Sequence, residues 1–499
     1  MAKTLLVFGI LWRLQSKKKQ IILNQTNHYI QKINSGSEFL KKIIQEQTIY
    51  GVTTGYGDSC TNTIAEHFHE KLPLNLARFH GCGLGKHFSS EITRAILAVR
   101  LCSLAYGFSG IRFELLKELE FLLQNDILPL IPEEGSVGAS GDLTPLSYIA
   151  RTLIGEEKVI FQNQEYQSKQ LFKELKHKVF QLKEKESLAL MNGTSVMTAI
   201  ACIVFARTNY LIQLCSRITA MASIALKGNS FHFDELLFSL KPHKGQMQIA
   251  EWIRQDLNDT NQTNNYSRLQ DRYSIRCAPH IIGVLADALP FFSNIIETEI
   301  NSTNDNPVIC AQTEKIMHGG HFYGGHIAFV MDSMKVQIAN LADMMDRQMA
   351  LLVDEKFNNG LPANLSGCFN TEKYINHGLK ALQISVSAWT AEALKNTMPA
   401  SVFSRSTECH NQDKVSMGTI AGRDCLRVLE LTEQVAAGLL IAVKQALELR
   451  PDLQLSANIK IMFDNLNKHI AFIEQDRPLE ETLRNLIKLI HNEEWKLYV

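Results

Sequence analysis

The feature that most constrains the fold of this chain is a sustained helical spacing of apolar side chains in its second half. One series consists of Met331, Met334, Ile338, Leu341, Met345, Met349 and Leu352. Because an α-helix has about 3.6 residues per turn, these side chains share one face of a long helix. A second series runs over residues 428–449 and stops before Pro451, and a third helix is predicted over residues 384–397, ahead of Pro399. Long helices with apolar faces pack side by side, so the sequence predicts an elongated helix bundle.

The first third of the chain has a mixed pattern. Helical spacings over residues 90–108 and 113–123 alternate with glycine-rich loops at residues 51–57, 81–85 and 135–141. Glycine tolerates positive φ and lets the backbone approach a ligand closely, so these loops are candidate site loops. We therefore predict a mainly α protein with two domains. A mixed N-terminal domain with the site loops covers residues 1–195, and a bundle of long helices covers residues 196–499.

Charge and cysteine usage exclude several classes of function. Lys plus Arg and Asp plus Glu each number 51, so the formal net charge is zero. This balance argues against a nucleic-acid partner and against an anionic membrane surface. Ten cysteines without a CxxC pair favour reduced thiols and a cytoplasmic location. His67 and His69 are two residues apart, which places them on opposite sides of a helix, so we expect no metal site there.

Two apolar stretches bear on targeting or membrane insertion. The run at residues 5–12 is short and Arg13 closes it, so it does not match a secretory signal. Residues 199–226 are longer but contain Arg207 and Arg217. That pattern predicts a buried helix and no membrane span.

The densest candidate for chemistry lies in the segment from Gly135 to Tyr148, which reads GSVGASGDLTPLSY. It predicts a tight glycine turn that leads into a helix. Asp142 is the expected N-cap, and Pro145 falls in the first turn, where its missing N–H is tolerated.

This segment and six others in the same order resemble the signature of the histidine and phenylalanine ammonia-lyase family. The other segments are residues 50–57, 190–194, 270–277, 304–307, 318–324 and 408–413. In that family an Ala-Ser-Gly triplet cyclises into 4-methylidene-imidazol-5-one (MIO), which here implies Ala139, Ser140 and Gly141. The residue types suit the reaction, because Gly141 has an unhindered nitrogen, Ser140 has a hydroxyl to eliminate and Ala139 is small. The resemblance implies no external cofactor.

The same resemblance assigns roles to other side chains. Tyr50 is the base that removes the β-proton, and we expect positive potential nearby to lower its pKa. Tyr273 lines the electrophile, and Arg276 grips the substrate carboxylate with its planar guanidinium. Asn192, Gln270 and Phe322 line the substrate pocket.

Three further positions bear on the substrate, which the resemblance implies is a small aromatic amino acid. Phe79 and His80 occupy the selecting pair, and Gln412 stands where histidine enzymes of the family carry a glutamate. Without that carboxylate, an imidazole loses its acceptor, so we expect phenylalanine or tyrosine to be converted to the arylacrylate (cinnamate or coumarate). The sixth motif has His321 where the family usually has Asn, and the sequence assigns no effect to it.

Three alternatives stay open at this point. The first is a histidine ammonia-lyase that forms urocanate, which His80 favours. The second is a 2,3-aminomutase that returns the ammonia to the β-carbon. The third is a protein that binds without catalysis. The resemblance also implies a homotetramer in which each site is assembled from three chains.

Overall fold

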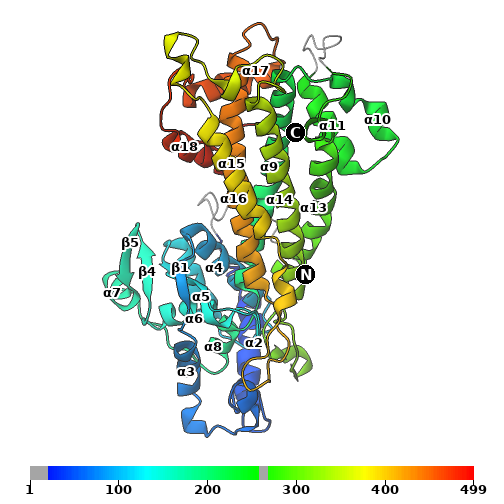
Figure 1. Cartoon of the computed structure of the whole chain (residues 1–499). Helices are drawn as coiled ribbons and strands as arrows, with labels where there is room; N and C mark the ends of the chain where they lie inside the picture. The colour runs from blue at the N-terminus through cyan, green and yellow to red at the C-terminus, as the bar shows by residue number, and fades with distance from the viewer. Residues whose placement is uncertain (1–20, 258–267, 499) are drawn as a thin grey trace. The chain divides into compact units, whose positions relative to one another are not determined.

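We describe a computed structural model of the chain over residues 21–257 and 268–498. The apolar run at residues 5–12 lies outside these described residues. Within them the predicted mainly α fold is confirmed, with long helices and a few short strands (Figure 1). All ten cysteines fall in the described part of the chain and carry free thiols.

The chain groups into two compact units. The first unit contains the described residues up to Ile203 together with Ser293–Asp332 and Pro399–Arg423. The second unit contains Val204–Phe292, Ser333–Met398 and the chain from Asp424 onward. These units are discontinuous, whereas the sequence predicted two contiguous domains divided near residue 195. Two later segments of the chain pack into the first unit, and the local spacing of apolar residues does not encode such long-range packing. The domain boundary itself stays a prediction.

Most helices that lie wholly in the first unit come from the first 200 residues. They are α2 (Asn27–Ile43), α3 (Lys71–Phe79), α4 (Ser90–Leu104), α5 (Phe113–Gln124), α6 (Leu143–Leu153), α7 (Ser168–Glu174) and α8 (Glu186–Met191). Helices α4 and α5 pack on each other, and α3, α6 and α8 pack together. Both predicted helices of this region are present, and α4 ends before Gly107, whose φ is +81°.

The strands of the first unit form three small antiparallel sheets. β1 (Leu84–His87) pairs with β3 (Pro132–Glu134), and β6 (Val308–Cys310) pairs with β7 (Lys315–Met317). β4 (Lys158–Phe161) lies between β2 (Leu128–Pro129) and β5 (Gln164–Gln167), with Val159 opposite Tyr166. A buried cluster joins α2 and β6 to Ile49 and Val52, which lie just before and just after Tyr50 in the sequence. It comprises Phe39, Leu40, Ile43, Ile49, Val52 and Ile309. This cluster anchors both sides of Tyr50.

Four long helices have residues in both units, and the second unit holds the remaining helices. The four are α9 (Ser195–Ala225), α13 (Ala278–Ile300), α14 (Gly325–Val353) and α16 (Gly418–Glu448). The others are α10 (Glu235–Ser239), α11 (Lys244–Leu257), α12 (Tyr273–Arg276), α15 (Lys380–Lys395), α17 (Ala457–His469) and α18 (Glu480–His491). All three predicted long helices are present as α14, α15 and α16.

Within the second unit the long helices lie side by side (Figure 1). The Gln348 amide of α14 donates to the Thr219 hydroxyl of α9 at 2.9 Å. A Cβ added at Gly438 of α16 would meet Val386 of α15 at 2.6 Å, so the two backbones approach closely at this glycine. The predicted bundle therefore rests on interlocked apolar faces with a few polar links.

Two stretches, Ser195–Ala225 and Tyr273–Ile300, pass a length and hydropathy test for membrane-spanning helices. The first is 78% buried inside the protein over its most apolar window, and the second is 33% buried. Core helices of globular proteins pass the same test, so this is weak evidence for a membrane. The burial of the first stretch agrees with the buried helix predicted over residues 199–226.

Candidate functional site

The Ala139-Ser140-Gly141 triplet lies in a loop of the first unit directly before α6. Ala139 and Ser140 are half-buried, and Gly141 is buried. Gly141 has a φ of +74°, and a Cβ at this position would overlap the carbonyl group of Gly193. Only glycine fits here, for both conformational and steric reasons.

Residues 192 and 193 hold the triplet from the other side. Asn192 Nδ2 donates to the Ser140 carbonyl at 2.8 Å, and the Gly193 N–H donates to the same oxygen at 3.3 Å. The Asp142 N–H donates to the Gly193 carbonyl at 2.7 Å. Among the described residues, the Gly141 N–H donates no hydrogen bond. The loop therefore polarises the Ser140 carbonyl with two donors and leaves the Gly141 nitrogen unengaged.

Asp142 is the N-cap residue of α6, as the sequence predicted, but its carboxylate bonds elsewhere. Its side chain makes no capping bond to that helix, and instead Oδ2 accepts from the Val196 and Met197 N–H groups, each at 3.0 Å. Those groups begin α9, so the carboxylate satisfies the N-terminus of a helix more than 50 residues away in sequence. Burial raises the pKa of Asp142 to about 6, while hydrogen bonds from Thr419 and the α9 backbone oppose the rise.

A buried arginine supports the segment behind the triplet. Arg100 of α4 is fully buried, and its Nη1 donates to the Asn192 carbonyl at 3.2 Å and to Asn304 Oδ1 at 3.1 Å. Burial lowers the pKa of Arg100 to about 10, and the carboxylates of Asp305 and Asp142 oppose that shift. The sequence analysis missed Arg100. The available signal was one charged residue inside an otherwise apolar stretch of a predicted helix.

Tyr50 lies between the buried residues Ile49 and Val52 and is itself half-buried. Its hydroxyl oxygen accepts a hydrogen bond from the Gly57 N–H at 2.8 Å. The prediction that the pKa of Tyr50 is lowered is wrong, because the surrounding groups of this chain raise it. Burial raises the pKa of Tyr50, and the charge of Glu408 raises it further, whereas the Gly57 N–H lowers it.

Gln412 contacts the triplet directly, because its Nε2 donates to the Ser140 hydroxyl oxygen at 3.2 Å. Two residues that follow in the chain hold the other end of the loop. The Ser416 hydroxyl donates to the Gly138 carbonyl at 3.1 Å, and the Met417 N–H donates to the Val137 carbonyl at 2.9 Å. The structure thus brings together three distant segments at the triplet, from around residues 140, 192 and 412.

The two residues predicted to select the substrate lie at the C-terminal end of α3. Phe79 is 59% exposed, and its ring centroid is 4.3 Å from that of His80. His80 Nδ1 is 3.0 Å from the Leu76 carbonyl, and burial lowers the pKa of this imidazole. In the described part of the chain, no hydrogen bond joins His80 to the triplet. Phe322 is half-buried and His321 is exposed, both in the turn before α14.

The remaining three predicted residues belong to the second unit. Gln270 is exposed, and Tyr273, at the start of α12, is 70% exposed. The Arg276 guanidinium lies 4.6 Å from the Tyr273 ring centroid, and its Nε donates to the Asp271 carbonyl at 2.9 Å. Tyr273 and Arg276 therefore form a local pair that presents an aromatic face and a cation together.

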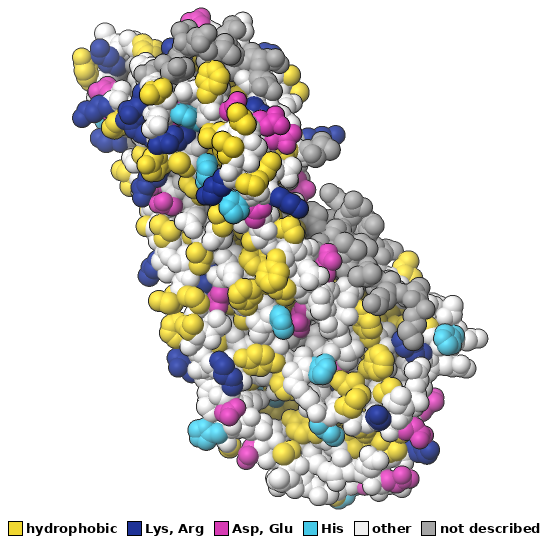
Figure 2. Space-filling model, turned by 90° about the vertical axis from the view of Figure 1, so that its right-hand side faces the viewer, with side chains coloured by type: hydrophobic (Ala, Val, Ile, Leu, Met, Phe, Trp, Pro, Cys, Tyr) yellow, Lys and Arg dark blue, Asp and Glu magenta, His cyan; other side chains and the backbone are white. Residues whose placement is uncertain are grey.

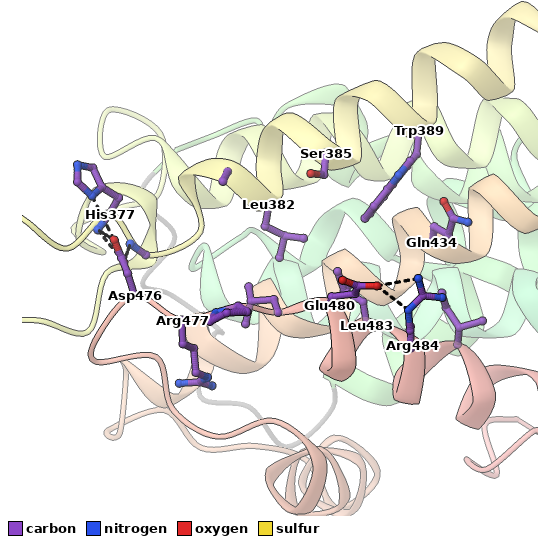
Figure 3. Close-up of a pocket in the computed structure, with 15 residues that line it drawn as sticks. His377, Leu382, Ser385, Trp389, Gln434, Asp476, Arg477, Glu480, Leu483 and Arg484 are labelled. Carbon is purple, nitrogen blue, oxygen red and sulfur yellow. Dashed lines mark hydrogen bonds and ion pairs between the residues drawn. The ribbon is translucent and has the colours of Figure 1, made fainter.

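A cavity of about 630 Å³ in the second unit lies between α15 and α18 (Figure 3). Trp389, Leu382 and Leu483 line it, and the lining residue Arg484 pairs with Glu480 at 2.7 Å. None of the predicted site residues lines this cavity, so we do not assign it to the same chemistry.

Comparison with known proteins places the chain in a family. The family described as aromatic amino acid lyase matches residues 11–468. The histidine ammonia-lyase of Bacillus velezensis is 34% identical over 460 residues, which cover 92% of this chain and 89% of that protein. The histidine ammonia-lyase of Staphylococcus saprophyticus is 33% identical over 472 residues, with 93% of each chain covered.

Solved structures give the same result for the fold. Tyrosine aminomutase from Streptomyces globisporus superposes with a TM-score of 0.91 at 30% identity and covers 98% of this chain and 96% of its own. Histidine ammonia-lyase from Trypanosoma cruzi superposes with a TM-score of 0.89 at 28% identity and covers 98% of this chain and 92% of its own.

Proposed function

Because the chain belongs to the aromatic amino acid lyase family, we propose that it eliminates ammonia from an aromatic L-amino acid. The observation that carries the proposal is the environment of Ser140. Its carbonyl accepts two N–H donors, its hydroxyl faces Gln412, and the neighbouring Gly141 nitrogen is unengaged.

The triplet fits the MIO group that the resemblance implies. Closing the ring needs a glycine nitrogen free to reach the Ala139 carbonyl, and Gly141 meets this need at a φ that other residues rarely adopt. When formed, the group supplies an electrophile that makes the substrate amine a better leaving group. Asn192 and the Gly193 N–H would continue to donate to the former Ser140 carbonyl and so favour electron flow toward it.

Side chains of the protein carry out proton removal and substrate orientation. Tyr50 takes the β-proton, for which the Gly57 N–H stabilises the phenolate form. Since burial and Glu408 raise the pKa of Tyr50, a positive charge must enter the site for the base to act near neutral pH, and the substrate ammonium brings one. Arg276 orients the substrate carboxylate so that the β-hydrogen faces Tyr50.

Histidine is the first substrate we propose, because both curated relatives described above are histidine ammonia-lyases. Their names support the urocanate alternative better than the phenylalanine or tyrosine specificity predicted from Gln412. One observation supports phenylalanine or tyrosine as a second candidate substrate. The residue beside Ser140 is an amide, Gln412, and the nearby carboxylate of Glu408 accepts the Asp58 N–H. At position 412 an imidazole would therefore meet an amide where histidine enzymes of the family carry a carboxylate.

We also propose a homotetramer with composite sites. Tyr273 is 70% exposed although its predicted role is to line the electrophile. Large apolar side chains are exposed on long helices of the second unit, including Val284 and Phe291 on α13 and Ile384 on α15. Figure 2 views the protein from the side on which α13 is drawn, and hydrophobic side chains are visible on that face.

A substrate panel tests the function. Purified protein is incubated with L-histidine, L-tyrosine, L-phenylalanine or L-tryptophan, and ammonia release and product mass are recorded. An arylacrylate such as urocanate or coumarate supports the lyase, whereas a β-amino acid of unchanged mass identifies a 2,3-aminomutase. Ser140→Ala should abolish turnover, and the intact wild-type protein should lack the mass of two water molecules. An active protein of unmodified mass would refute the role of the triplet.

A further inference from the structure

The turn at residues 407–412 contacts two parts of the first unit that the reaction needs close together. One end of the turn contacts Ser140, and the other contacts the loop of Tyr50. We propose that this turn is a brace that sets Tyr50 against Ser140, with Glu408 as the positioning residue for the Tyr50 loop. The assignment of Tyr50 as the base rests on the proposed function, but the brace itself is a structural claim.

The end of the turn at Gln412 is fixed internally. Thr407 and Gln412 pair through two backbone hydrogen bonds, of 3.0 Å and 3.2 Å. The Thr407 hydroxyl also donates to Gln412 Oε1 at 2.8 Å. This bond orients the amide so that its Nε2 points to the Ser140 hydroxyl at 3.2 Å. The amide is therefore held between the Thr407 and Ser140 hydroxyls.

The end of the turn at Glu408 holds the loop. Both of its carboxylate oxygens accept from the Asp58 N–H, at 2.8 Å and 3.1 Å. The preceding residue, Gly57, donates its N–H to the Tyr50 hydroxyl at 2.8 Å. Successive backbone N–H groups of one loop therefore bond Tyr50 and Glu408. A charged acceptor makes the bond to Asp58 stronger than a neutral one.

The fit of Glu408 against the loop is tight. Gly57 has a φ of +59°, and a Cβ there would overlap the Glu408 carboxylate. Asn411 Nδ2 donates to Glu408 Oε2 at 2.8 Å and keeps the carboxylate turned toward the loop. The carboxylate is thus held from both sides, which is typical of a side chain that positions another element.

The backbone of the turn is strained at the same place. Glu408, Cys409 and His410 are consecutive non-glycine residues in the left-handed region, with φ of 52°, 54° and 65°. Such conformations are unfavourable for residues with a Cβ and persist where surrounding contacts impose them. Here they allow Glu408 to reach the loop while Gln412 reaches Ser140.

Amide hydrogen exchange tests the brace without depending on activity. We would compare wild type, Glu408→Ala, Glu408→Gln and the control Glu174→Ala, which removes an exposed carboxylate of α7 that accepts from the Gln170 amide. Exchange in peptides covering residues 50–60 should be about tenfold faster in Glu408→Ala, because the loop loses a charge-assisted bond. Glu408→Gln keeps a neutral acceptor and should give about a two- to threefold increase. The control should match wild type.

If residues 50–60 exchange at the same rate in Glu408→Ala and in Glu174→Ala, the proposal is overturned. If Glu408→Ala accelerates exchange across the whole first unit, Glu408→Gln decides: an increase confined to residues 50–60 supports the brace, and no increase there overturns it. These outcomes hold even if the wild-type protein releases no ammonia, so failure of the proposed function is recognised separately in the substrate panel.

Steady-state kinetics of the active protein give a second test, because a purely structural role of Glu408 would not shift the pH dependence of kcat. Glu408→Ala should lower kcat about tenfold or more with little change in KM, because Tyr50 is misplaced while substrate still binds. Glu408→Gln removes a negative charge near the phenol, so the pKa of Tyr50 falls and the rising limb of kcat against pH moves to lower pH. A pH profile that is unchanged in Glu408→Gln would refute the placement of Glu408 beside Tyr50.

Discussion

Replacing Asp142 by asparagine should change the pH dependence of stability while the shape of the site is retained. The carboxylate is fully buried. One oxygen accepts from the N–H groups of Val196 and Met197, and the other faces the hydroxyls of Ser136 and Thr419. An asparagine in the same orientation accepts from the two N–H groups through Oδ1. Its NH2 group donates to the two hydroxyl oxygens, so every hydrogen bond has a counterpart and only the charge is removed.

The magnitude follows from the pKa of this group. Burial raises the pKa of Asp142 from its ordinary value of 3.8 to about 6. The folded state therefore binds the proton more tightly than the unfolded chain. The difference of about 2 in pKa corresponds to a free energy of about 3 kcal/mol. This contribution is fully present below pH 3.8 and is lost as the pH rises through about 6. Above pH 7 both states are ionised, and the buried charge carries a constant cost.

Urea unfolding of wild type and Asp142→Asn between pH 4 and pH 8 measures this effect. The free energy of unfolding of wild type minus that of the variant should fall by about 2 kcal/mol between pH 4 and pH 6.5 and then level off, because the unfolded chain is already partly ionised at pH 4. Asp452→Asn, which changes an exposed carboxylate, controls for general charge effects. A difference that varies by less than about 1 kcal/mol over this range would refute the assignment of a buried, ionisable Asp142.

Other substitutions test the site directly. Gly141→Ala should yield folded protein of unmodified mass and no activity, because a Cβ there overlaps the Gly193 carbonyl; mass spectrometry checks this, and a mature electrophile in the variant would contradict it. Tyr50→Phe should lower kcat by about a hundredfold or more with a smaller effect on KM, measured by steady-state kinetics, because the proton acceptor is lost. Gln412→Glu should raise kcat/KM for histidine relative to tyrosine by about tenfold or more, since it adds an acceptor for the imidazole; an unchanged ratio would show that residue 412 does not select the substrate.

Several features of the site could be read from the sequence because they are local. Helical spacing predicted α14, α15 and α16, and the Ala139-Ser140-Gly141 triplet stood out through its glycine-rich surroundings. The boundaries were less accurate: α16 begins at Gly418, ten residues before the predicted series, since its first turns lie beside the triplet loop in the first unit. Apolar spacing marks the face that packs on other long helices and is less regular where a helix begins at a polar site.

The sequence by itself determined the elements and the chemical identity of the triplet, because periodicity and motif are properties of consecutive residues. Only the tertiary structure decided the partners of those residues. Asp142, predicted to cap the helix that follows it, binds the start of α9, and Arg100 supports Asn192 from within α4. Tyr50, expected to have a lowered pKa, has a raised one because burial and Glu408 outweigh the Gly57 N–H. Desolvation and charge proximity depend on which distant segments meet in space, and residue order along the chain does not specify those distances.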